Sequence, residues 1–313
     1  MRALVTGGAG FVGTNLIKRL SNNNHVEYRE NIIASVDNYS TGLAENEINS
    51  PGVRYFGGDI SKITDYSDMI EDCDIIFHLA ARARIQPSFK TPTQSLQSNV
   101  VGTQNILEWA RKNGNIPVIY AGSSSKHGDI YSNPYSFTKW QGEQLCEMYS
   151  KVYDLPVTIC RFYNVYGPHQ LTEGDYCTVL GIFESLYKNN KPLTITGDGE
   201  QRRDFTHVHD IVDGLIKCHS MINKYTWPPA NSFSQFELGR GKNYSINEIA
   251  DAFGDYPKEY IDEWRGEMRD TLCTDTKAKD LLGWKDQVLP ETHRQRRYFP
   301  EVKVAKFPAR AMD

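Results

Sequence analysis

The chain has 313 residues, of which 39% are hydrophobic, and its formal net charge is −4. This composition suits one large domain or two interlocked ones, while the acidic balance and the lack of apolar runs of ~18 residues argue against nucleic-acid and membrane partners. The six cysteines include no Cys-x-x-Cys pair, which argues against a metal site or a disulfide framework, and the lack of a signal-like start predicts a cytoplasmic protein.

The first half of the chain alternates short apolar runs with helical patterns. Strands are predicted at 3–6, 32–36, 53–56, 75–79, 118–121 and 157–160, and helices at 11–20, 95–112 and 135–153. Strands that alternate with helices form βαβ units, and these give a parallel sheet with right-handed crossovers. The predicted fold class is therefore α/β, a doubly wound parallel sheet whose ligands bind at the carboxyl ends of the strands.

The pattern changes after about residue 166, where Gly-Pro, Gly-Asp-Gly and Trp-Pro-Pro breaks shorten the elements. We expect residues 1–165 to form the sheet domain, with a return segment near 208–223. Residues 166–313 are expected to form mainly a smaller α/β lobe that binds substrate. The polar run at 21–30 and the basic run at 293–297 are predicted to face solvent.

A glycine-rich turn follows the first predicted strand. Residues 6–13 read Thr-Gly-Gly-Ala-Gly-Phe-Val-Gly, which contains Gly-x-Gly-x-x-Gly from Gly8 and Gly-x-x-Gly-x-x-Gly from Gly7. Glycine permits positive φ and a close approach of the backbone to a diphosphate, and the helix that begins near Phe11 would direct its N–H groups at the phosphates. Alone the motif could be an ordinary turn, but the strand before it and the helix after it predict a Rossmann-type dinucleotide site.

Acidic residues follow the next two predicted strands. Asp37 lies ~20 residues beyond the glycines, where a carboxylate accepts hydrogen bonds from the ribose hydroxyls of NAD and repels the extra phosphate of NADP. No arginine follows it directly, so NAD is the predicted cofactor. Asp59 could bond the adenine edge or cap a turn, and the two readings are equally compatible with the sequence.

Tyr135 and Lys139 are spaced i, i+4 at the start of a predicted helix and so share one of its faces. A nearby ammonium would lower the pKa of the tyrosine from its usual ~10 and make it a usable general base. The spacing alone is weak evidence, because Tyr187 and Lys191 share it. Tyr135, however, follows the end of the fifth predicted strand, where the hydroxyl of Ser123 could contact the same substrate oxygen.

Ordered motifs along nearly the whole chain, up to about Trp284, carry a resemblance to a known family. They include Phe-His-Leu-Ala-Ala at 77–81, Ser-Ser-Ser at 123–125, Pro-Tyr-Ser-Phe-Thr-Lys at 134–139, Arg-Phe-Tyr-Asn-Val-Tyr-Gly-Pro at 161–168 and Arg-Asp-Phe at 203–205. On these motifs the chain resembles the extended short-chain dehydrogenase/reductase superfamily, in its NAD-dependent nucleotide-sugar epimerase and dehydratase branch, and within it the UDP-sugar 4-epimerases.

The resemblance implies a role for each matching position. Tyr135 would be the catalytic base, Lys139 its partner and a ligand of the nicotinamide ribose, and Ser123 the active-site hydroxyl. With Tyr135 and Lys139, the implied NAD contacts are Gly7, Gly10, Phe11, Val12, Asp37, Asn38, Asp59, Ile60, Leu79, Ala80, Ala81 and Asn99, the last either structural or close to the cofactor. The implied contacts with a nucleotide-diphosphate sugar are Arg82, Ser124, Asn164, Arg203, Arg265 and Thr271.

Two of these substrate contacts, Asn164 and Arg203, would hold the diphosphate. A guanidinium suits that role because its planar fork donates two parallel charge-assisted bonds. Arg203 could instead form a surface ion pair with Asp204. Arg265 stands one place from the position where the family carries an arginine, here Trp264, and it could reach a phosphate or face solvent.

The remaining contacts concern the sugar. A tyrosine is usual at the position of Thr271 in strict UDP-glucose epimerases, so this smaller side chain would leave room for an N-acetyl group at C2. Arg82 and Arg84 follow the fourth predicted strand, close to the expected sugar site. They could bind a sugar carboxylate or pair with surface acids.

The residues after Ser123 bear on the reaction. The 4,6-dehydratases of the family carry Asp-Glu where this chain has Ser124 and Ser125, which cannot act as carboxylic acids, and the glutamate of the related decarboxylases is also missing. The resemblance then implies 4-epimerisation through a transient 4-ketose, with the hydride returned to the other face. The segment from Ser125 to Tyr135 is shorter than usual, which predicts a pocket wall that is more open or is built by another element.

Other readings stay open. The chain could be a dehydratase or an NADPH-type reductase of the same fold, against which the missing carboxylates and Asp37 argue. It could also be a non-catalytic NAD-binding regulatory protein, a class that would not require Ser123, Tyr135 and Lys139 together. Analogy with the family implies a homodimer formed through helices at 95–112 and 136–153.

Overall fold

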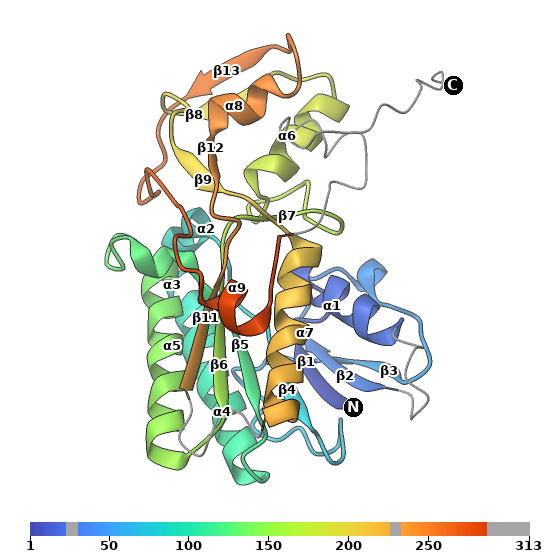
Figure 1. The fold of residues 1–313 in the computed structure, drawn as a ribbon. Helices are drawn as coiled ribbons and strands as arrows, with labels where there is room; N and C mark the ends of the chain where they lie inside the picture. The colour runs from blue at the N-terminus through green and yellow to red at the C-terminus, as the bar shows by residue number, and fades with distance from the viewer. Residues whose placement is uncertain (23–30, 226–232, 287–313) are drawn as a thin grey trace.

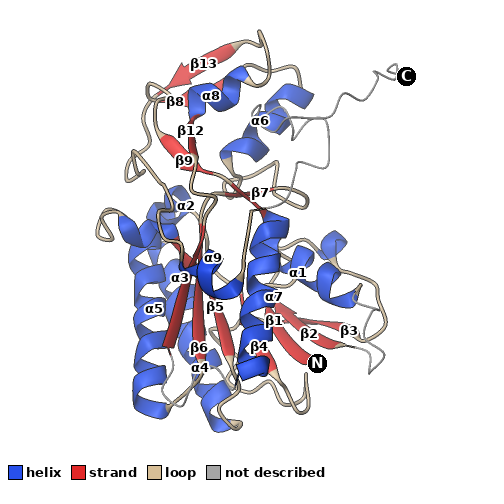
Figure 2. Ribbon diagram, in the orientation of Figure 1, coloured by secondary structure: helices blue, strands red, loops and turns tan. Residues whose placement is uncertain are grey.

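A seven-stranded sheet forms the centre of the computed structural model, which describes residues 1–22, 31–225 and 233–286. Its strands are ordered β11-β6-β5-β4-β1-β2-β3 and each neighbouring pair is parallel, so the predicted doubly wound fold is confirmed (Figures 1 and 2). The strands are β1 Arg2–Thr6, β2 Ile32–Asp37, β3 Val53–Gly57, β4 Ile75–His78, β5 Val118–Ser123, β6 Val157–Phe162 and β11 Phe233–Leu238.

Both faces of this sheet are covered by helices. In β4, Ile75 and Phe77 pack with α1 (Phe11–Ser21) and α7 (Val208–Tyr225), whereas Ile76 packs with α4 (Gly102–Lys112) and α5 (Pro134–Tyr153) on the other face. Successive side chains of a strand point to opposite faces, so a strand buried on both sides reads as a continuous apolar run. This explains why periodicity in the sequence predicted these strands.

The helix predicted at 95–112 is interrupted. The chain forms α2 (Ile85–Lys90) and α3 (Pro92–Leu96), then one π-helical turn at Gln97–Val101, and continues as α4. Asn99 lies in that turn and is buried. Its side-chain Oδ1 accepts the backbone N–H of Arg82 at 2.8 Å, and its Nδ2 donates to the backbone carbonyl of Arg82 at 3.2 Å. The turn thereby fixes the loop that follows β4.

A smaller lobe lies beside the carboxyl ends of the sheet strands and has a core of its own, around Leu180, Phe183, Leu193, Ile195 and Ile249 (Figure 1). Its elements are α6 Val179–Lys188, β8 Leu193–Thr196, β9 Arg202–Asp204, β12 Asn243–Ser245, α8 Ile246–Asp251 and β13 Lys258–Ile261. The short strands β7 (Val165–Tyr166) and β10 (Thr206–His207) pair where the chain passes between the lobes. The chain returns to the large sheet at α7, β11 and α9 (Lys277–Leu282).

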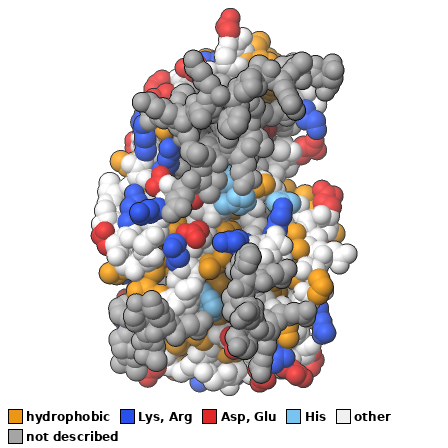
Figure 3. Space-filling view, turned by 45° about the vertical axis from the view of Figure 1, so that its right-hand side comes forward, with side chains coloured by type: hydrophobic (Ala, Val, Ile, Leu, Met, Phe, Trp, Pro, Cys, Tyr) orange, Lys and Arg blue, Asp and Glu red, His pale blue; other side chains and the backbone are white. Residues whose placement is uncertain are grey.

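The surface bears on the predictions about partners. On the face drawn in Figure 3, positive and negative side chains are interspersed wherever the residues are described. None of the helices in the described part of the chain is long and apolar enough to cross a bilayer. The basic run at 293–297, the Trp-Pro-Pro break at 227–229 and most of the polar run at 21–30 lie outside the described residues.

Candidate active site

The glycine-rich turn between β1 and α1 packs directly against other backbone. Gly7 has a φ of +74°, and a Cβ added there would lie 2.9 Å from the backbone of Ala80. A Cβ on Gly13 would lie 2.1 Å from the carbonyl oxygen of Gly7. A side chain is thus excluded at Gly7 and at Gly13, and the backbone of the turn lines the adjoining cavity. This is the arrangement that a diphosphate requires at a helix N-terminus.

A first cavity extends from this turn along the carboxyl ends of β2, β4 and β5. Asp37 lines it and is 7% exposed; its carboxylate accepts the N–H groups of Ala9 at 3.0 Å and Tyr39 at 2.8 Å. Burial raises the pKa of Asp37, and these backbone hydrogen bonds oppose the rise. Further predicted cofactor residues line the same cavity: Gly7, Gly10, Phe11, Val12, Asn38, Ile60, Leu79, Ala80 and Ala81. Together with the bare turn, this lining fits a dinucleotide with an unphosphorylated ribose.

Two predicted cofactor residues do not line this cavity. Asp59 accepts the backbone N–H of Ser61 at 2.9 Å and the hydroxyl of Ser61 at 2.8 Å, so its contacts are those of a turn cap. Asn99 holds the Arg82 loop and also donates to the hydroxyl of Thr138 at 3.0 Å. The contacts of Asp59 are thus those of a turn cap, and the contacts of Asn99 are those of a structural residue.

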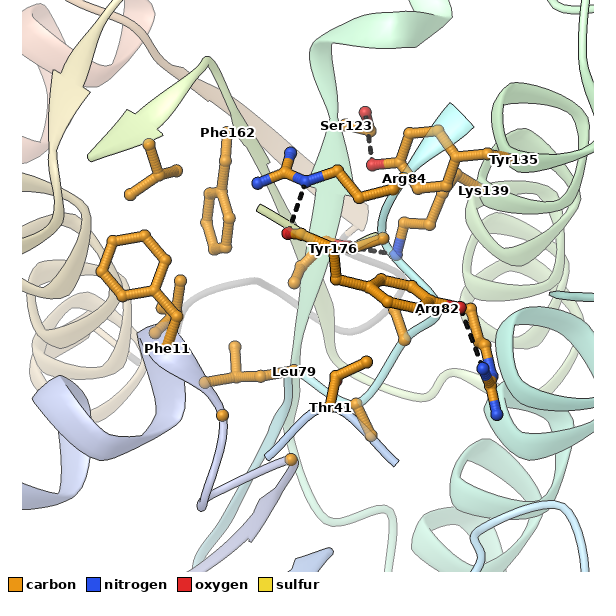
Figure 4. Close-up of a pocket in the computed structure, with 18 of the residues that line it drawn as sticks. Phe11, Thr41, Leu79, Arg82, Arg84, Ser123, Tyr135, Lys139, Phe162 and Tyr176 are labelled. Carbon is orange, nitrogen blue, oxygen red and sulfur yellow. Dashed lines mark hydrogen bonds between the residues drawn. The ribbon is translucent and has the colours of Figure 1, made fainter. Parts of the chain in front are cut away.

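Tyr135 enters the first cavity from the first turn of α5. Asn133 caps this helix by accepting the N–H of Ser136 at 2.8 Å. Pro134 occupies the first helical position, where its missing backbone N–H would have no partner within the helix. The Tyr135 hydroxyl donates to Ser123 Oγ at 3.1 Å (Figure 4), and Ser123 Oγ donates to Ser125 Oγ at 2.9 Å. A chain of three hydroxyls thus ends at the cavity.

Lys139 does not pair with Tyr135 as the shared helix face predicted. Its Nζ donates to the Ala121 carbonyl at 2.6 Å and lies 4.2 Å from the centre of the Tyr120 ring, and burial lowers its pKa to about 8. Burial raises the pKa of Tyr135, while the Ser123 hydroxyl and the Arg84 guanidinium act in the opposite direction. The cation that favours the phenolate is thus Arg84. Helical spacing places two side chains on one face of a helix. The position of the lysine ammonium, however, is set by the groups that it contacts.

Buried charges support the strand end behind Ser123. Arg161 donates through Nε and Nη2 to Glu143 at 2.8–3.1 Å and through Nη1 to Glu237 at 2.7 Å. Glu143 also accepts the backbone N–H of Ser123 at 3.4 Å, and His127 lies 3.0 Å from the same Glu237 oxygen. The network joins α5, β6 and β11 around the serine and fixes its position.

A distant segment closes the wall beside the short loop between Ser125 and Tyr135. Asn133 donates its side-chain amide to the Gly266 carbonyl at 3.2 Å, and a Cβ added at Gly128 would lie 3.0 Å from Met268. Of the two predictions made for this wall, the structure shows that another element builds it.

Five of the six predicted substrate residues line the first cavity: Arg82, Ser124, Asn164, Arg203 and Thr271. The exception is Arg265, whose guanidinium lies over the Phe89 ring at 5.2 Å and which lines neither of the two cavities described.

The ion pair between Arg203 and Asp204 is not formed. Asp204 is fully buried and accepts the backbone N–H groups of Arg240, Gly241 and Cys273 at 2.9–3.0 Å. These hydrogen bonds commit its carboxylate to the loop. Arg203 pairs with Glu267 instead, at 3.4 Å.

A second cavity of about 780 Å³ adjoins the first, within the range of small-molecule sites. It lies between the smaller lobe and α2, and its lining includes Gln201, Phe205 and Trp264. Several residues line both cavities: Arg84, Ile85, Asn164, Val165, Thr178, Arg203, Glu267 and Met268. No role was predicted for three of them, because neither a sequence motif nor a periodic pattern includes Thr178, Glu267 or Met268.

Comparison with known proteins agrees with this geometry. The model of the NAD dependent epimerase/dehydratase family matches residues 3–226. A UDP-glucose 4-epimerase of Mycolicibacterium smegmatis is 31% identical over 92% of this chain and 94% of its own length. Two solved structures are similar, each at 26% identity and covering 92% of this chain. They are the UDP-glucose 4-epimerase of Thermotoga maritima with UDP-glucose (TM-score 0.79, 94% of that chain) and the UDP-glucuronic acid 4-epimerase of Bacillus cereus with UDP-glucuronic acid and NAD (TM-score 0.80, 95% of that chain).

Proposed function

Because the chain belongs to the NAD-dependent epimerase/dehydratase family, we propose that it is an NAD-dependent 4-epimerase of a UDP-sugar. The observation that carries this proposal is the Tyr135 hydroxyl, 3.1 Å from Ser123 Oγ in a cavity that begins at a bare glycine turn. The next two residues, Ser124 and Ser125, supply hydroxyls and no carboxylate. Relatives named as UDP-glucose and UDP-glucuronate 4-epimerases support the substrate class.

The protein's own part in the reaction is to move one proton at the C4 oxygen. Bound NAD would supply the hydride chemistry at C4. Tyr135 accepts the proton of the C4 hydroxyl, and its phenolate is favoured by the Arg84 charge and by a hydrogen bond from Ser123. A serine hydroxyl both accepts and donates, so Ser123 can follow the tyrosine through both protonation states.

Lys139 would hold the cofactor ribose in this mechanism. It lines the first cavity, and its ammonium has three N–H groups, of which one is directed at the Ala121 carbonyl. Asp37 would accept the hydroxyls of the other ribose. These roles need no second acid or base beside the sugar.

Elimination chemistry would require such a group. Glu143 contacts the Ser123 N–H, but it is held by Arg161 and does not line the first cavity. Glu267 does line it and is engaged with Arg203. Since positions 124 and 125 offer only hydroxyls, the site favours return of the hydride over loss of water.

The test is incubation with UDP-glucose, UDP-galactose, UDP-N-acetylglucosamine and UDP-glucuronate, read by proton NMR at the anomeric and C4 positions. We expect interconversion of a C4 pair without added NADH. Tyr135→Phe should lower turnover by about 10²–10⁴-fold and keep NAD. Tyr187→Phe is the matched control, because it alters the other Tyr-x-x-x-Lys pair. A 4-keto-6-deoxy product, or no interconversion of any sugar, would overturn the proposal.

We also propose that residues before about 165 mainly bind the cofactor and that residues after it mainly bind the substrate.

A further proposal is that the protein is a homodimer through α4 and α5. Met148, Val152 and Tyr153 of α5 are exposed by 38%, 61% and 42%, and a partner subunit on this helix would cover them. Light scattering after size-exclusion chromatography should give twice the chain mass. Val152→Glu should shift that mass to the monomer, and an unmodified monomer would refute the dimer.

A further inference from the structure

Arg84 is a cation beside the catalytic tyrosine that the mechanism uses only as a charge. It lies in the loop between β4 and α2, and its Nε donates to the Tyr176 carbonyl at 3.0 Å. It forms no ion pair with any residue that the structure describes, and burial lowers the pKa of its guanidinium. Figure 4 shows the side chain extending into the first cavity between the Ser123–Tyr135 pair and Phe162. A half-buried guanidinium that lines both cavities, with no carboxylate within ion-pair distance among the described residues, is placed to pair with an anionic ligand.

The position of Arg84 indicates which anion this is. Arg84 lines both cavities, as do Arg203 and Asn164, so these three side chains lie where the cavities meet. A nucleotide sugar whose C4 reaches Tyr135 and whose nucleoside occupies the second cavity must pass its diphosphate through this junction. Glu267 lies there too, 3.4 Å from Arg203, and its charge also acts on Arg84.

The other arginines near the cavities are committed elsewhere. Arg265 stacks on Phe89, and Arg269 donates through both terminal nitrogens to Asp198, each at 2.7 Å. Arg82 donates to the Tyr176 hydroxyl at 2.9 Å and lines only the first cavity. Two guanidinium groups therefore remain at the junction, against the single carboxylate of Glu267.

We propose that Arg84 is a second ligand of the substrate diphosphate, so that it and Arg203, the arginine already expected there, clamp the diphosphate from opposite lobes, with Glu267 between them when no diphosphate is bound. This inference rests on the proposed function. The two arginines and Glu267 carry a net charge of about +1, which complements the roughly −2 charge of a diphosphate, and each fork can donate paired bonds to phosphate oxygens. The Tyr176 carbonyl aims Arg84 in advance, which reduces the entropy lost on binding.

The clamp has a consequence for the reaction. Epimerisation at C4 requires the ketose to present both faces to the same hydride source, while the nucleotide stays in place. A diphosphate fixed by one arginine from each lobe leaves the sugar free to turn about its bond to the phosphate. The cations thus hold the part of the substrate that must not move.

Titration calorimetry with UDP and UMP tests the clamp without requiring turnover. Arg84→Gln and Arg203→Gln should each weaken UDP at least tenfold, as expected for loss of hydrogen bonds between charged groups, and should reduce the preference for UDP over UMP. Arg84→Lys keeps the positive charge but not the planar guanidinium, so its affinity for UDP should lie between those of Arg84→Gln and the unmodified protein. Arg54→Gln, the same change at an exposed position of β3, is the control and should bind UDP normally. Retained NAD and an unchanged melting temperature verify the fold, and Arg84→Lys decides the matter if Arg84→Gln does not fold.

The outcomes separate the clamp from the proposed function. If Arg84→Gln, or Arg84→Lys in its place, binds UDP as tightly as the unmodified protein, the clamp is refuted even where epimerisation is observed. If it loses only UDP-glucuronate and keeps UDP and UDP-glucose, Arg84 binds the sugar carboxylate and the clamp is equally refuted. An unmodified protein that binds UDP through both arginines but converts no sugar would leave the clamp standing and overturn the reaction. Failure to bind UDP at all would overturn both.

Discussion

Replacing Lys139 by methionine should stabilise the folded protein while it abolishes turnover. Lys139 is 4% exposed, and burial lowers its pKa from 10.5 to about 8. A difference of about 2.5 pKa units corresponds to a cost on the order of 3 kcal/mol for keeping the ammonium in the folded state. Methionine fills a similar volume without charge, and loss of the 2.6 Å hydrogen bond to Ala121 should cost about 1 kcal/mol. We expect a net gain of roughly 2 kcal/mol at pH 7.

The pH dependence identifies the cause. In the folded state Lys139 loses its proton near pH 8, whereas in the unfolded chain it keeps the proton to about pH 10.5. The unfolded state therefore binds more protons across this window, and the stability of the unmodified protein rises with pH there. Below pH 8 the full cost is present. The stability difference between Lys139→Met and the unmodified protein should accordingly be largest at pH 7 and should change sign, to about −1 kcal/mol, above about pH 10.5, where only the lost hydrogen bond to Ala121 remains.

Urea denaturation of NAD-free protein at pH 7 and at pH 10 measures both quantities. Lys151→Met is the matched control, because Lys151 lies on the same helix, is exposed and, within the described part of the chain, forms an ion pair only with Glu147. Its effect should stay within about 0.5 kcal/mol at either pH. The reasoning fails if Lys139→Met is less stable than the unmodified protein at pH 7, or if the difference does not change with pH.

Three further substitutions test the cofactor and substrate sides of the site. Gly7→Ala should cost at least about 2 kcal/mol in the free energy of unfolding and prevent NAD binding, because φ is +74° and the new Cβ would lie 2.9 Å from Ala80; wild-type affinity in a fluorescence titration would contradict this. Asp37→Ser should raise the Kd for NAD at least tenfold and bring it closer to the Kd for NADP. Parallel titrations with both cofactors measure the ratio of the two Kd values, and an unchanged ratio would contradict this prediction. Arg265→Gln should leave the KM for the UDP-sugar within about twofold because its guanidinium stacks on Phe89 outside both cavities, whereas a tenfold rise in initial-rate assays would place Arg265 on the substrate.

The features that local sequence determines were predictable, and those set by distant partners were not. The strands β1, β2, β4, β5 and β6 appear as apolar runs because both faces of each are buried. The glycines indicate a turn with no room for a side chain at Gly7 or Gly13. The edge strand β11 was not predicted, since it pairs with β6 from far along the chain. The Lys139 side chain is oriented by its hydrogen bond to the Ala121 carbonyl, and the Arg84 side chain by its hydrogen bond to the Tyr176 carbonyl. No sequence motif predicts either contact.

The cations of this site differ in what balances them, and that difference distinguishes binding from support. Arg161 is buried between Glu143 and Glu237, so its removal would leave carboxylates uncompensated and should destabilise the fold by about 3–5 kcal/mol. Lys139 has no carboxylate within ion-pair distance among the described residues, so its removal should have the opposite sign. The net charge of −4 repels an anionic substrate at long range, which leaves local cations to provide the attraction. If replacing a cation stabilises the ligand-free protein but weakens ligand binding, that cation serves the ligand and not the fold. Bound ligand should then offset the free-energy cost of burying the cation, because binding stabilises the folded state.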